Sequence, residues 1–574
     1  MVKNALYHGE AAMRKQVLVG MEFFDRIIEG NYFYIDKTMF IKELLENRGE
    51  ATLITRPRRF GKTLNMSMLK CFFDAGKDSR HLFDRLKIME HKDIVEKHQG
   101  KYPVVFMTLK DVELSTFDNS LVKLNFLISS LYKQHLYILD HDRIDENDKE
   151  KFMLYRSGKA TAAELESALI FLMECLHGYY GRKAVVLIDE YDAPINNALQ
   201  EGFYSEMVKF MRGFLGSAFK SSGFLEFGVL TGVQRISREA LVSGFNNPKV
   251  CGVANDAFAD CYGFTEDEVR LACEQYGYGG RFCDVKRWYD GYRFGQAGDI
   301  YNPWSITNFL CEGKLRNYWA NTGGMSVLED VFFKGSLSLK DDIAGLLTGI
   351  PVKMEYDDHI VYPIPYDSDD AFWSLMLNAG YLKPCDGSAE GSFYAELVNR
   401  EVKDTFARCI RLWFKRQQRA IHTAIQEFSE HLLNGDAEGV GRTLNDDLLN
   451  NPSCHDFKEE NSYHMFIYGI LLAASKDCTV LSNQESGKGR SDCVIKPDDK
   501  SRSAVIVEFK HVKELPPGGA LEELRGLKEE ARKGLNQINE KAYVHNLKKE
   551  GYGQIYKYGI AFHKKSCEVA MEQA

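Results

Sequence analysis

The sequence has no long hydrophobic run and no cysteine pattern of the kind that builds a disulfide framework. Its longest apolar stretch, MFIYGILLAA, is shorter than the roughly 18 residues that indicate a membrane span. The 13 cysteines are scattered without a CxxC pair, which favours reduced thiols over disulfides or a zinc site. The opening segment MVKNALYHGEAAMRKQV lacks the apolar region of a signal peptide. We therefore expect a cytoplasmic protein that does not enter a membrane.

The chain also lacks internal repeats, low-complexity tracts and a strong excess of one charge. Its net charge of −9 over 574 residues argues against bulk coating of nucleic acid but leaves room for a local basic groove. An apolar content of 44% and a charged content of 27% are typical of a globular protein. At this length we expect more than one domain, each with its own core.

What the sequence does contain is a strand–loop–helix stretch, LITRPRRFGKTLNMSMLKCFF, at residues 53–73. Gly61, Lys62 and Thr63 match the end of the phosphate-loop pattern G-x-x-x-x-G-K-[ST]. In such loops backbone N–H groups face a polyphosphate, the lysine reaches the β- and γ-phosphates, and the hydroxyl binds Mg²⁺. Arg56 stands at the first glycine position, where glycine normally permits unusual backbone angles. A chance GKT turn is the alternative, which the flanking strand and periodic helix disfavour.

Strands and helices alternate after this loop. Apolar runs and helical periodicity predict strands at 103–111, 182–195 and 224–237 and helices at 118–138, 162–178 and 203–220. Such alternation predicts a parallel sheet with helices on both faces, in which ligands bind beyond the carboxyl ends of the strands. The GKT loop, the acids at 189–190 and a polar turn at Thr231 all fall at such ends.

We expect these strand ends to form one nucleotide site. Asp189 would hold Mg²⁺ together with Thr63, while Glu190 would orient the hydrolytic water. An ordinary strand end with solvated acids is the alternative. Polar groups after the next strand could sense the γ-phosphate or stabilise charge during transfer, although surface roles fit them equally well: Thr231, Gln234 and Arg235.

Composition divides the rest of the chain. The aromatic run KRWYDGYRFGQAGDIYNPWSI predicts turns held by aromatic packing in a lid. Prolines near 351–365 mark a junction, paired helices follow, and a polar stretch at 445–461 precedes the last module. We therefore expect four domains: a P-loop domain at 18–240, a helical and aromatic lid region at 241–350, a connecting and mostly helical region at 351–454, and a C-terminal domain at 455–570.

The C-terminal domain contains a predicted hairpin with an acid on each strand. If its turn centres on Lys500, Asp492 and Glu508 stand opposite each other with Cβ atoms about 5 Å apart. Lys510 then shares a face with Glu508. Two carboxylates and a lysine suit Mg²⁺ or Mn²⁺ against a phosphodiester, although a surface salt-bridge ladder is an open alternative. Neighbouring groups could complete the site: Glu485, Arg490 and Gln537. Around the hairpin we expect a helix at 462–475, strands at 479–483 and 558–570, and a long helix at 519–543.

Several motifs in order resemble the bacterial AAA-ATPase-like family: YIDKTMFI, LITRPRRFGKTLNMSML, VVLIDEYDAPI, LTGVQRIS, GFNN, WYDGYRFG and YNPWSI. That family has arginine-rich GK[ST] loops of the same kind. The C-terminal GRSD and VIVEFK resemble the PD-(D/E)XK nuclease superfamily, which commonly follows this ATPase domain. The resemblance covers residues 18–310 and 455–565. It implies phosphate and Mg²⁺ binding at Lys62 and Thr63, a second nucleotide motif at Asp189 and Glu190, a nuclease core at Asp492, Glu508 and Lys510, and a further glutamate, Glu459 or Glu460.

The sequence thus predicts an α/β chain, with a P-loop NTPase sheet and helical lid region followed by an α/β PD-(D/E)XK nuclease-like domain. The predicted function is an ATP- and Mg²⁺-binding ATPase fused to a metal-dependent nuclease that acts on nucleic acid, with DNA favoured. The alternative is a non-nucleolytic, ATP-dependent switch that uses its C-terminal fold for recognition. The strand type, the coupling of ATP turnover to cleavage and the oligomeric state stay open, and a homo-oligomer through the ATPase domain is one option.

Overall fold

The chain forms two compact units in the computed structural model, Met1–Trp319 with Lys353–Glu401 and Ala320–Val352 with Val402–Ala574. The structure describes residues 14–220, 222–236, 248–319, 337–356, 369–385, 391–417, 419–448, 471, 478–486, 489–512, 520–540, 544–563 and 566–574. The predicted division into four domains stays a prediction. Among the described helices, none combines the length and the apolar character needed to cross a bilayer.

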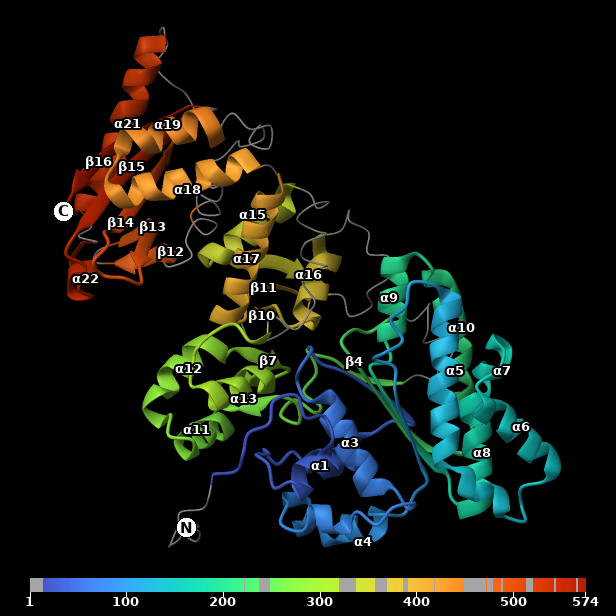
Figure 1. The fold of residues 1–574 in the computed structure, drawn as a ribbon. Coiled ribbons are helices and arrows are strands. Elements are labelled where there is room, and N and C mark those ends of the chain that lie inside the picture. Colours follow the sequence, from blue (N-terminus) through green and yellow to red (C-terminus); the bar gives the residue numbers. More distant parts are fainter. Residues whose placement is uncertain are drawn as a thin grey trace, which may run out of the picture. The chain divides into compact units, whose positions relative to one another are not determined.

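The first unit is built on a parallel sheet, of which Figure 1 labels β4. The strand order is β2-β3-β4-β1-β5. Its strands are β1 Ala51–Thr55, β2 Val104–Thr108, β3 Ala184–Asp189, β4 Leu225–Gly232 and β5 Lys249–Cys251. Every pairing between them is parallel. This confirms the predicted parallel sheet. In this order β4, which carries Thr231, lies between β1 and β3. The GKT loop follows β1, and the acids lie at the end of β3.

Helices bury both faces of this sheet. The helices that cover it include α3 Lys62–Phe73, α5 Phe117–Gln134, α8 Ala168–Tyr180 and α10 Tyr204–Phe219. Successive strand residues point to opposite faces, and β1 and β3 are buried at every position. Leu53 and Val186 belong to the core that contains α5, α8 and α10. On β4, Phe227 packs against Phe73 of α3 with ring centroids 5.4 Å apart.

Shorter helices complete the wrapping of this sheet. They are α1 Phe24–Glu29, α2 Met39–Asn47, η1 Arg80–Phe83, η2 Lys87–Glu90, α4 Lys92–His98, η3 Leu136–Asp140, α6 Glu146–Ser157, α7 Ala162–Glu166 and α9 Ala193–Glu201. Local sequence fixes several of their ends. Asp145 accepts a hydrogen bond from the Asp148 N–H at the start of α6, and Gly158, with a φ of 69°, ends that helix.

An aromatic module follows β5 in the same unit. It comprises β6 Phe264–Thr265, α11 Glu266–Gln275, η5 Gly279–Arg281, α12 Phe282–Tyr289, β7 Tyr292–Phe294, β8 Ala297–Tyr301 and α13 Pro303–Glu312. Its strands form a sheet in the order β6-β8-β7, so the region predicted as helical also contains strands. A second small sheet has the order β10-β11-β9. Its elements are β9 Val352–Glu355, α16 Asp369–Asn378, β10 Leu382–Pro384 and β11 Ser392–Leu397.

The second unit contains a mixed sheet with the order β12-β13-β14-β15-β16. Its strands are β12 Cys478–Ser486, β13 Gly489–Pro497, β14 Ala504–His511, β15 Ile555–His563 and β16 Ser566–Gln573. Among the described pairings of this sheet, only that of β14 with β15 is parallel. Helix α21, Ala520–Glu540, contacts β14, β15 and β16. This mixed sheet with a helix against it confirms the predicted α/β class of the C-terminal domain.

The other helices of this unit are α15 Leu337–Thr348, α17 Arg400–Gln417, α18 Arg419–Asn434, α19 Ala437–Arg442, η7 Thr443–Leu448 and α22 Val544–Lys549. The first two residues of α17, Arg400 and Glu401, belong to the first unit. The stretch predicted as one final strand at 558–570 is instead an antiparallel pair, β15 and β16. The polar HKK inside it separates two runs that each form a strand. The helix predicted at 462–475, apart from Leu471, lies outside the described residues, as do Glu459 and Glu460.

Candidate functional sites

The phosphate-loop candidate runs from β1 into α3 with left-handed backbone at two residues. Arg59 has a φ of 68° and Gly61 a φ of 82°, and α3 begins at Lys62. Glycine takes such angles without cost, whereas an arginine does so only where the surrounding contacts enforce them. Arg56 has no positive φ. The arginine at the first glycine position therefore introduces no backbone strain of this kind.

The side chain of Arg56 is 0% exposed and ties the loop to a distant segment. Its guanidinium donates hydrogen bonds of 2.9–3.1 Å to the carbonyl oxygens of Thr55, Cys251, Gly252, Ala257 and Phe258. Its central carbon also lies 4.7 Å from the centre of the Phe294 ring. Arginine suits this position because its planar fork presents five N–H donors and stacks on aromatic rings. Arg56 is thus a structural residue of the loop.

Lys62 is buried beside the loop and faces the acid that directly follows β3. Only 3% of its surface is exposed. Its ammonium donates to the carbonyl oxygens of Arg56 and Pro57 at 3.3 and 3.2 Å, and it lies 3.4 Å from the Glu190 carboxylate. A buried ammonium held by carbonyl oxygens and one partly exposed acid can exchange these partners for phosphate oxygens.

Asp189 is the buried centre of the site. Thr63 and Thr231 donate their hydroxyls to its two carboxylate oxygens at 2.7 and 2.6 Å, and Thr108 donates at 3.4 Å. Burial, and then the charge of Glu190, raise the pKa of Asp189, while the hydroxyl donors and Lys62 act in the opposite direction. A buried carboxylate surrounded by hydroxyl oxygens fits a hard cation such as Mg²⁺. Thr63 and Thr231 were expected here from the sequence, whereas Thr108 was not.

Residues after β4 lie beside these acids. The backbone N–H of Gln234 donates to Asp192 at 3.0 Å. Arg235 is half-buried, and its charge acts on the hydroxyl of Tyr191, opposing the rise in its pKa that burial causes. Glu190, with a φ of 53°, is a further left-handed residue at the site. Hydrogen bonds join Thr63 and Thr231 to Asp189, and an ion pair joins Lys62 to Glu190. Gly61 directly precedes Lys62. Asp192 was missed, although the third acid in LIDEYDAPI was visible.

The aromatic module packs against the outer side of the loop. Phe60 makes edge-to-face contacts with the rings of Tyr292 and Phe294, with centroids 4.8 and 5.4 Å away. The guanidinium of Arg59 lies 4.3 Å from the ring centre of Trp304. The Arg58 carbonyl oxygen accepts a hydrogen bond from the Trp319 indole at 3.1 Å and another from Asn302 at 3.5 Å. The predicted aromatic region is therefore packed around the loop.

A buried carboxylate fastens this module to the start of α17. Glu401 accepts hydrogen bonds from the backbone N–H groups of Tyr318 and Trp319 at 2.5 and 2.6 Å and from the Ser305 hydroxyl at 2.7 Å. Asn302 caps α13 by accepting from the N–H groups that follow it. Glu401 thus fixes Trp319, which in turn holds the loop at Arg58.

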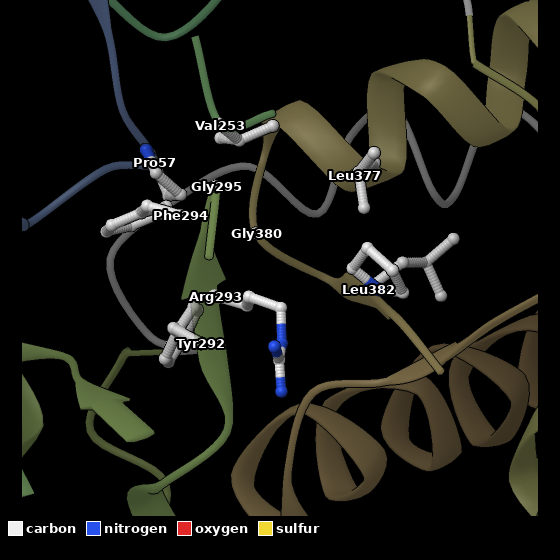
Figure 2. Close-up of a pocket in the computed structure, with 10 residues that line it drawn as sticks. Pro57, Val253, Tyr292, Arg293, Phe294, Gly295, Leu377, Gly380 and Leu382 are labelled. Atoms are coloured by element: carbon white, nitrogen blue, oxygen red, sulfur yellow. The ribbon is translucent and has the colours of Figure 1, made fainter. Parts of the chain in front are cut away.

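A pocket of about 360 Å³, including space open to solvent, lies beside Pro57. Figure 2 shows its lining residues coming from the loop, from β7, from the residue Val253 that follows β5, and from α16 and the segment after it. They are Pro57, Val253, Tyr292, Arg293, Phe294, Gly295, Leu377, Gly380, Leu382 and Pro384. The lining is mostly apolar, and Arg293 is its charged side chain. The pocket contains none of the acids or hydroxyls of the nucleotide site.

The C-terminal hairpin has the predicted register. Cys493 pairs with Val507 in the antiparallel ladder, which is the pairing that a turn centred on Lys500 requires. The Asp492 carboxylate accepts a hydrogen bond from the backbone N–H of Phe509 at 2.8 Å, next to Glu508. Glu508 is 2% exposed, and its carboxylate lies 3.8 Å from the Lys510 ammonium. The structure therefore brings the three predicted nuclease residues together on neighbouring strands.

Gln537 of α21 joins these residues. Its side-chain oxygen accepts a hydrogen bond from Lys510 at 2.8 Å, and its amide nitrogen donates to Glu508. Two glycines allow the helix to approach the sheet this closely. A Cβ at Gly559, which pairs with Glu508, would overlap the Ala531 carbonyl, and one at Gly534 would meet the Glu508 carbonyl at 3.4 Å. For Glu485 and Arg490 the structure gives only their pairing in the ladder.

A further group of three acids lies in the aromatic module, where a lysine of the same module forms ion pairs with them. Glu266, Asp290 and Asp299 lie close enough to share a cation. The ammonium of Lys286 occupies this position as an ion-pair partner of all three. This cluster therefore has the composition of an ion-pair network.

Comparison with known proteins agrees with this architecture. Residues 18–242 match the family described as "Predicted AAA-ATPase", and residues 458–572 match the PD-(D/E)XK nuclease superfamily. The chain is 26% identical, over 532 residues, to a protein of Azotobacter chroococcum mcd 1 described as "Uncharacterized protein in vnfD 5'region", covering 89% of this chain and 92% of that protein. No solved structure matches the chain. The chain thus joins a domain of the predicted AAA-ATPase family to a domain of the PD-(D/E)XK nuclease superfamily.

Proposed function

We propose that this protein is an ATPase fused to a Mg²⁺-dependent nuclease that cleaves nucleic acid, with DNA as the favoured substrate. The observation that carries the proposal is that each candidate site combines a buried carboxylate with a lysine. In the first unit, Asp189 and Glu190 lie next to Lys62. In the second, Glu508 lies 3.8 Å from Lys510. The match to the nuclease superfamily supports nucleic acid as the substrate class.

In the ATPase site, Lys62 would exchange its carbonyl partners for the β- and γ-phosphates of ATP. Thr63 and Asp189 would hold Mg²⁺ through hydroxyl and carboxylate oxygens. Hydrolysis joins a water oxygen to the γ-phosphorus and breaks its bond to the β–γ bridging oxygen, which releases ADP and phosphate. Glu190 would accept the proton that this water loses, because it is the partly exposed acid beside Lys62.

In the nuclease site, Asp492 and Glu508 would hold a divalent metal from adjacent strands. Lys510 would donate to the phosphodiester oxygens and offset their growing negative charge. Hydrolysis joins a water oxygen to phosphorus and breaks one phosphorus–oxygen bond, and the leaving oxygen takes up a proton. Gln537, which contacts both Glu508 and Lys510, would keep the two groups apart and correctly oriented. When bound, Mg²⁺ would neutralise phosphate charge and lower the pKa of a coordinated water.

The deciding experiment is a cleavage assay with the full chain. It uses single- and double-stranded DNA and RNA, Mg²⁺ or Mn²⁺, and ATP present or absent. We expect metal-dependent cleavage that disappears in Asp492→Ala. Lys510→Ala should lower the rate at least tenfold while leaving Mn²⁺ binding intact, because an ammonium is not a metal ligand.

The matched control is Asp498→Ala, which removes an exposed acid at the turn of the same hairpin. It should cleave like the wild type. Cleavage that survives Asp492→Ala would refute the nuclease site. A wild type that hydrolyses ATP but cleaves no member of the panel would instead favour the non-nucleolytic switch.

A further inference from the structure

Asp192 is a buried acid next to the nucleotide site, and it has no role in the hydrolysis steps proposed for that site. Its side chain is 1% exposed. It directly precedes α9, where an aspartate commonly caps the helix, yet its carboxylate makes no capping hydrogen bond. One carboxylate oxygen lies against Gly232 so closely that a Cβ on that glycine would come within 2.6 Å. The carboxylate is therefore directed at the end of β4.

The other oxygen of Asp192 holds the segment that follows β4. It accepts hydrogen bonds from the backbone N–H groups of Val233 and Gln234, both at 3.0 Å. The neighbouring Tyr191 holds the same segment from its other end. Its hydroxyl donates to the Gln234 carbonyl at 2.8 Å and accepts from the Ile236 N–H at 3.1 Å. Two adjacent side chains thus fix the backbone of residues 233–236.

This segment directly follows β4, whose Thr231 donates its hydroxyl to Asp189, and it carries the Gln234 side chain. Gln234 is 8% exposed, and within the described part of the chain its side-chain oxygen has no hydrogen-bond partner. A buried amide oxygen in that state is an acceptor suited to an ordered water or a ligand donor. The nearby charges of Glu190 and Lys62 act on Asp192, and burial followed by Glu190 raises the pKa of Asp192 to about 6. Asp192 therefore lies within the electrostatic field of the nucleotide site.

We propose that Asp192 is a positioning residue for ATP hydrolysis, which holds residues 233–236 so that Gln234 meets the terminal phosphate and its attacking water. The inference rests on the proposed ATPase function. Asp192 acts through hydrogen-bond acceptance and not through its charge. Asparagine can accept the same two N–H groups and should therefore replace it, whereas alanine should not.

The test measures steady-state ATP hydrolysis by the full chain, with kcat and KM determined separately. Asp192→Ala should lower kcat at least tenfold and change KM by less than threefold. Asp192→Asn should keep at least a third of the wild-type kcat. Gln234→Ala should reproduce the loss in kcat, and adding Asp192→Ala to it should cause little further loss, because both act on one step.

Asn196→Ala is the matched control. Asn196 donates to the same Asp192 oxygen at 3.2 Å but does not hold the 233–236 segment. Its kcat should equal that of the wild type. A purely structural role for Asp192 predicts instead a lower Tm with kcat unchanged in the folded fraction, or a KM increase at constant kcat. Either result overturns the proposal.

Two further results overturn it independently of how Asp192→Ala folds. One is a folded Asp192→Asn variant whose kcat is at least tenfold below that of the wild type, which would assign the effect to charge. The other is a Gln234→Ala variant with a kcat within twofold of the wild type. Failure of the ATPase proposal itself is distinguishable: the wild type would then hydrolyse no ATP, or Lys62→Ala would hydrolyse it equally well.

Discussion

The ammonium of Lys62 lies 3.4 Å from the carboxylate of Glu190. The two residues follow β1 and β3, which lie on either side of β4 in the sheet. The lysine is almost fully buried and the glutamate is partly exposed. A phosphate that binds the loop must compete with this carboxylate for the same ammonium. The acid proposed to accept the proton during hydrolysis should therefore also affect the affinity for nucleotide.

Changing either partner of this pair should have opposite effects on ATP affinity. Lys62→Ala should weaken ATP binding at least tenfold, because it removes the charge that meets the phosphates. Glu190→Gln should bind ATP at least as tightly as the wild type but turn over at least tenfold more slowly. Calorimetric titration with ATP and Mg²⁺ measures the first effect. Lys70→Ala, on the far end of α3, is the control, and equal affinity in Lys62→Ala and the wild type would contradict the assignment.

Arg56→Lys should destabilise the first unit by on the order of 3–5 kcal/mol. The lysine ammonium cannot reach all five carbonyl oxygens that the guanidinium bonds, so several would stay buried without a donor. Chemical denaturation measures the loss. Arg58→Lys is the matched control because Arg58 is exposed, and it should change the free energy of unfolding by less than about 0.5 kcal/mol. A loss below about 1 kcal/mol for Arg56→Lys would show that the clamp is dispensable.

Gly559→Ala should separate α21 from the sheet. The added Cβ would overlap the Ala531 carbonyl and come within 2.6 Å of the Leu535 nitrogen, both of which are backbone atoms that cannot rotate away. We expect a loss of about 1–3 kcal/mol and slower cleavage, because Gln537 would move from Glu508 and Lys510. Gly553→Ala has open space around its Cβ and is the control. Unchanged stability and cleavage in Gly559→Ala would falsify the close approach of this helix.

His135 should make the first unit sensitive to acid. Burial and, to a smaller extent, the charge of Lys70 lower its pKa from 6.5 to about 4. Between those values the unfolded chain binds a proton that the folded chain does not, so the free energy of unfolding falls as the pH drops from 6.5 to 4. His135→Gln should therefore lose about 2–4 °C less in Tm than the wild type between pH 7.5 and 5. His81→Gln, at an exposed histidine, should lose as much as the wild type, and equal losses in all three proteins would exclude His135 as the cause.

Strand and hairpin positions could be predicted because their signals are local. The apolar run before Asp189 and the alternation around Glu508 each fit within a few residues, and the hairpin register follows from counting outward from Lys500. The meeting of Thr63, Asp189 and Thr231 followed from the rule that parallel strands end on one edge.

Other features depend on partners far away in the chain. Arg56 stands at the first glycine position of the loop pattern, yet its partners lie near Cys251 and Phe258, about 200 residues later. Asp192 resembles a helix cap, and only the folded chain shows that it binds the segment after β4 instead. The division of the last stretch into β15 and β16 was missed because its apolar residues were counted together across a polar interruption.

The hydrogen bonds of the Glu401 carboxylate determine which truncated fragments of this protein should keep the phosphate loop intact. The family match at its N-terminus ends at residue 242, but the compact unit that holds the phosphate loop closes only when the chain returns at 353–401. A fragment cut at 242 would lack four of the five carbonyl oxygens that accept from Arg56. One cut at 319 would leave the Tyr318 and Trp319 N–H groups without their acceptor. The shortest expression product expected to stay soluble with an intact loop therefore extends to Glu401.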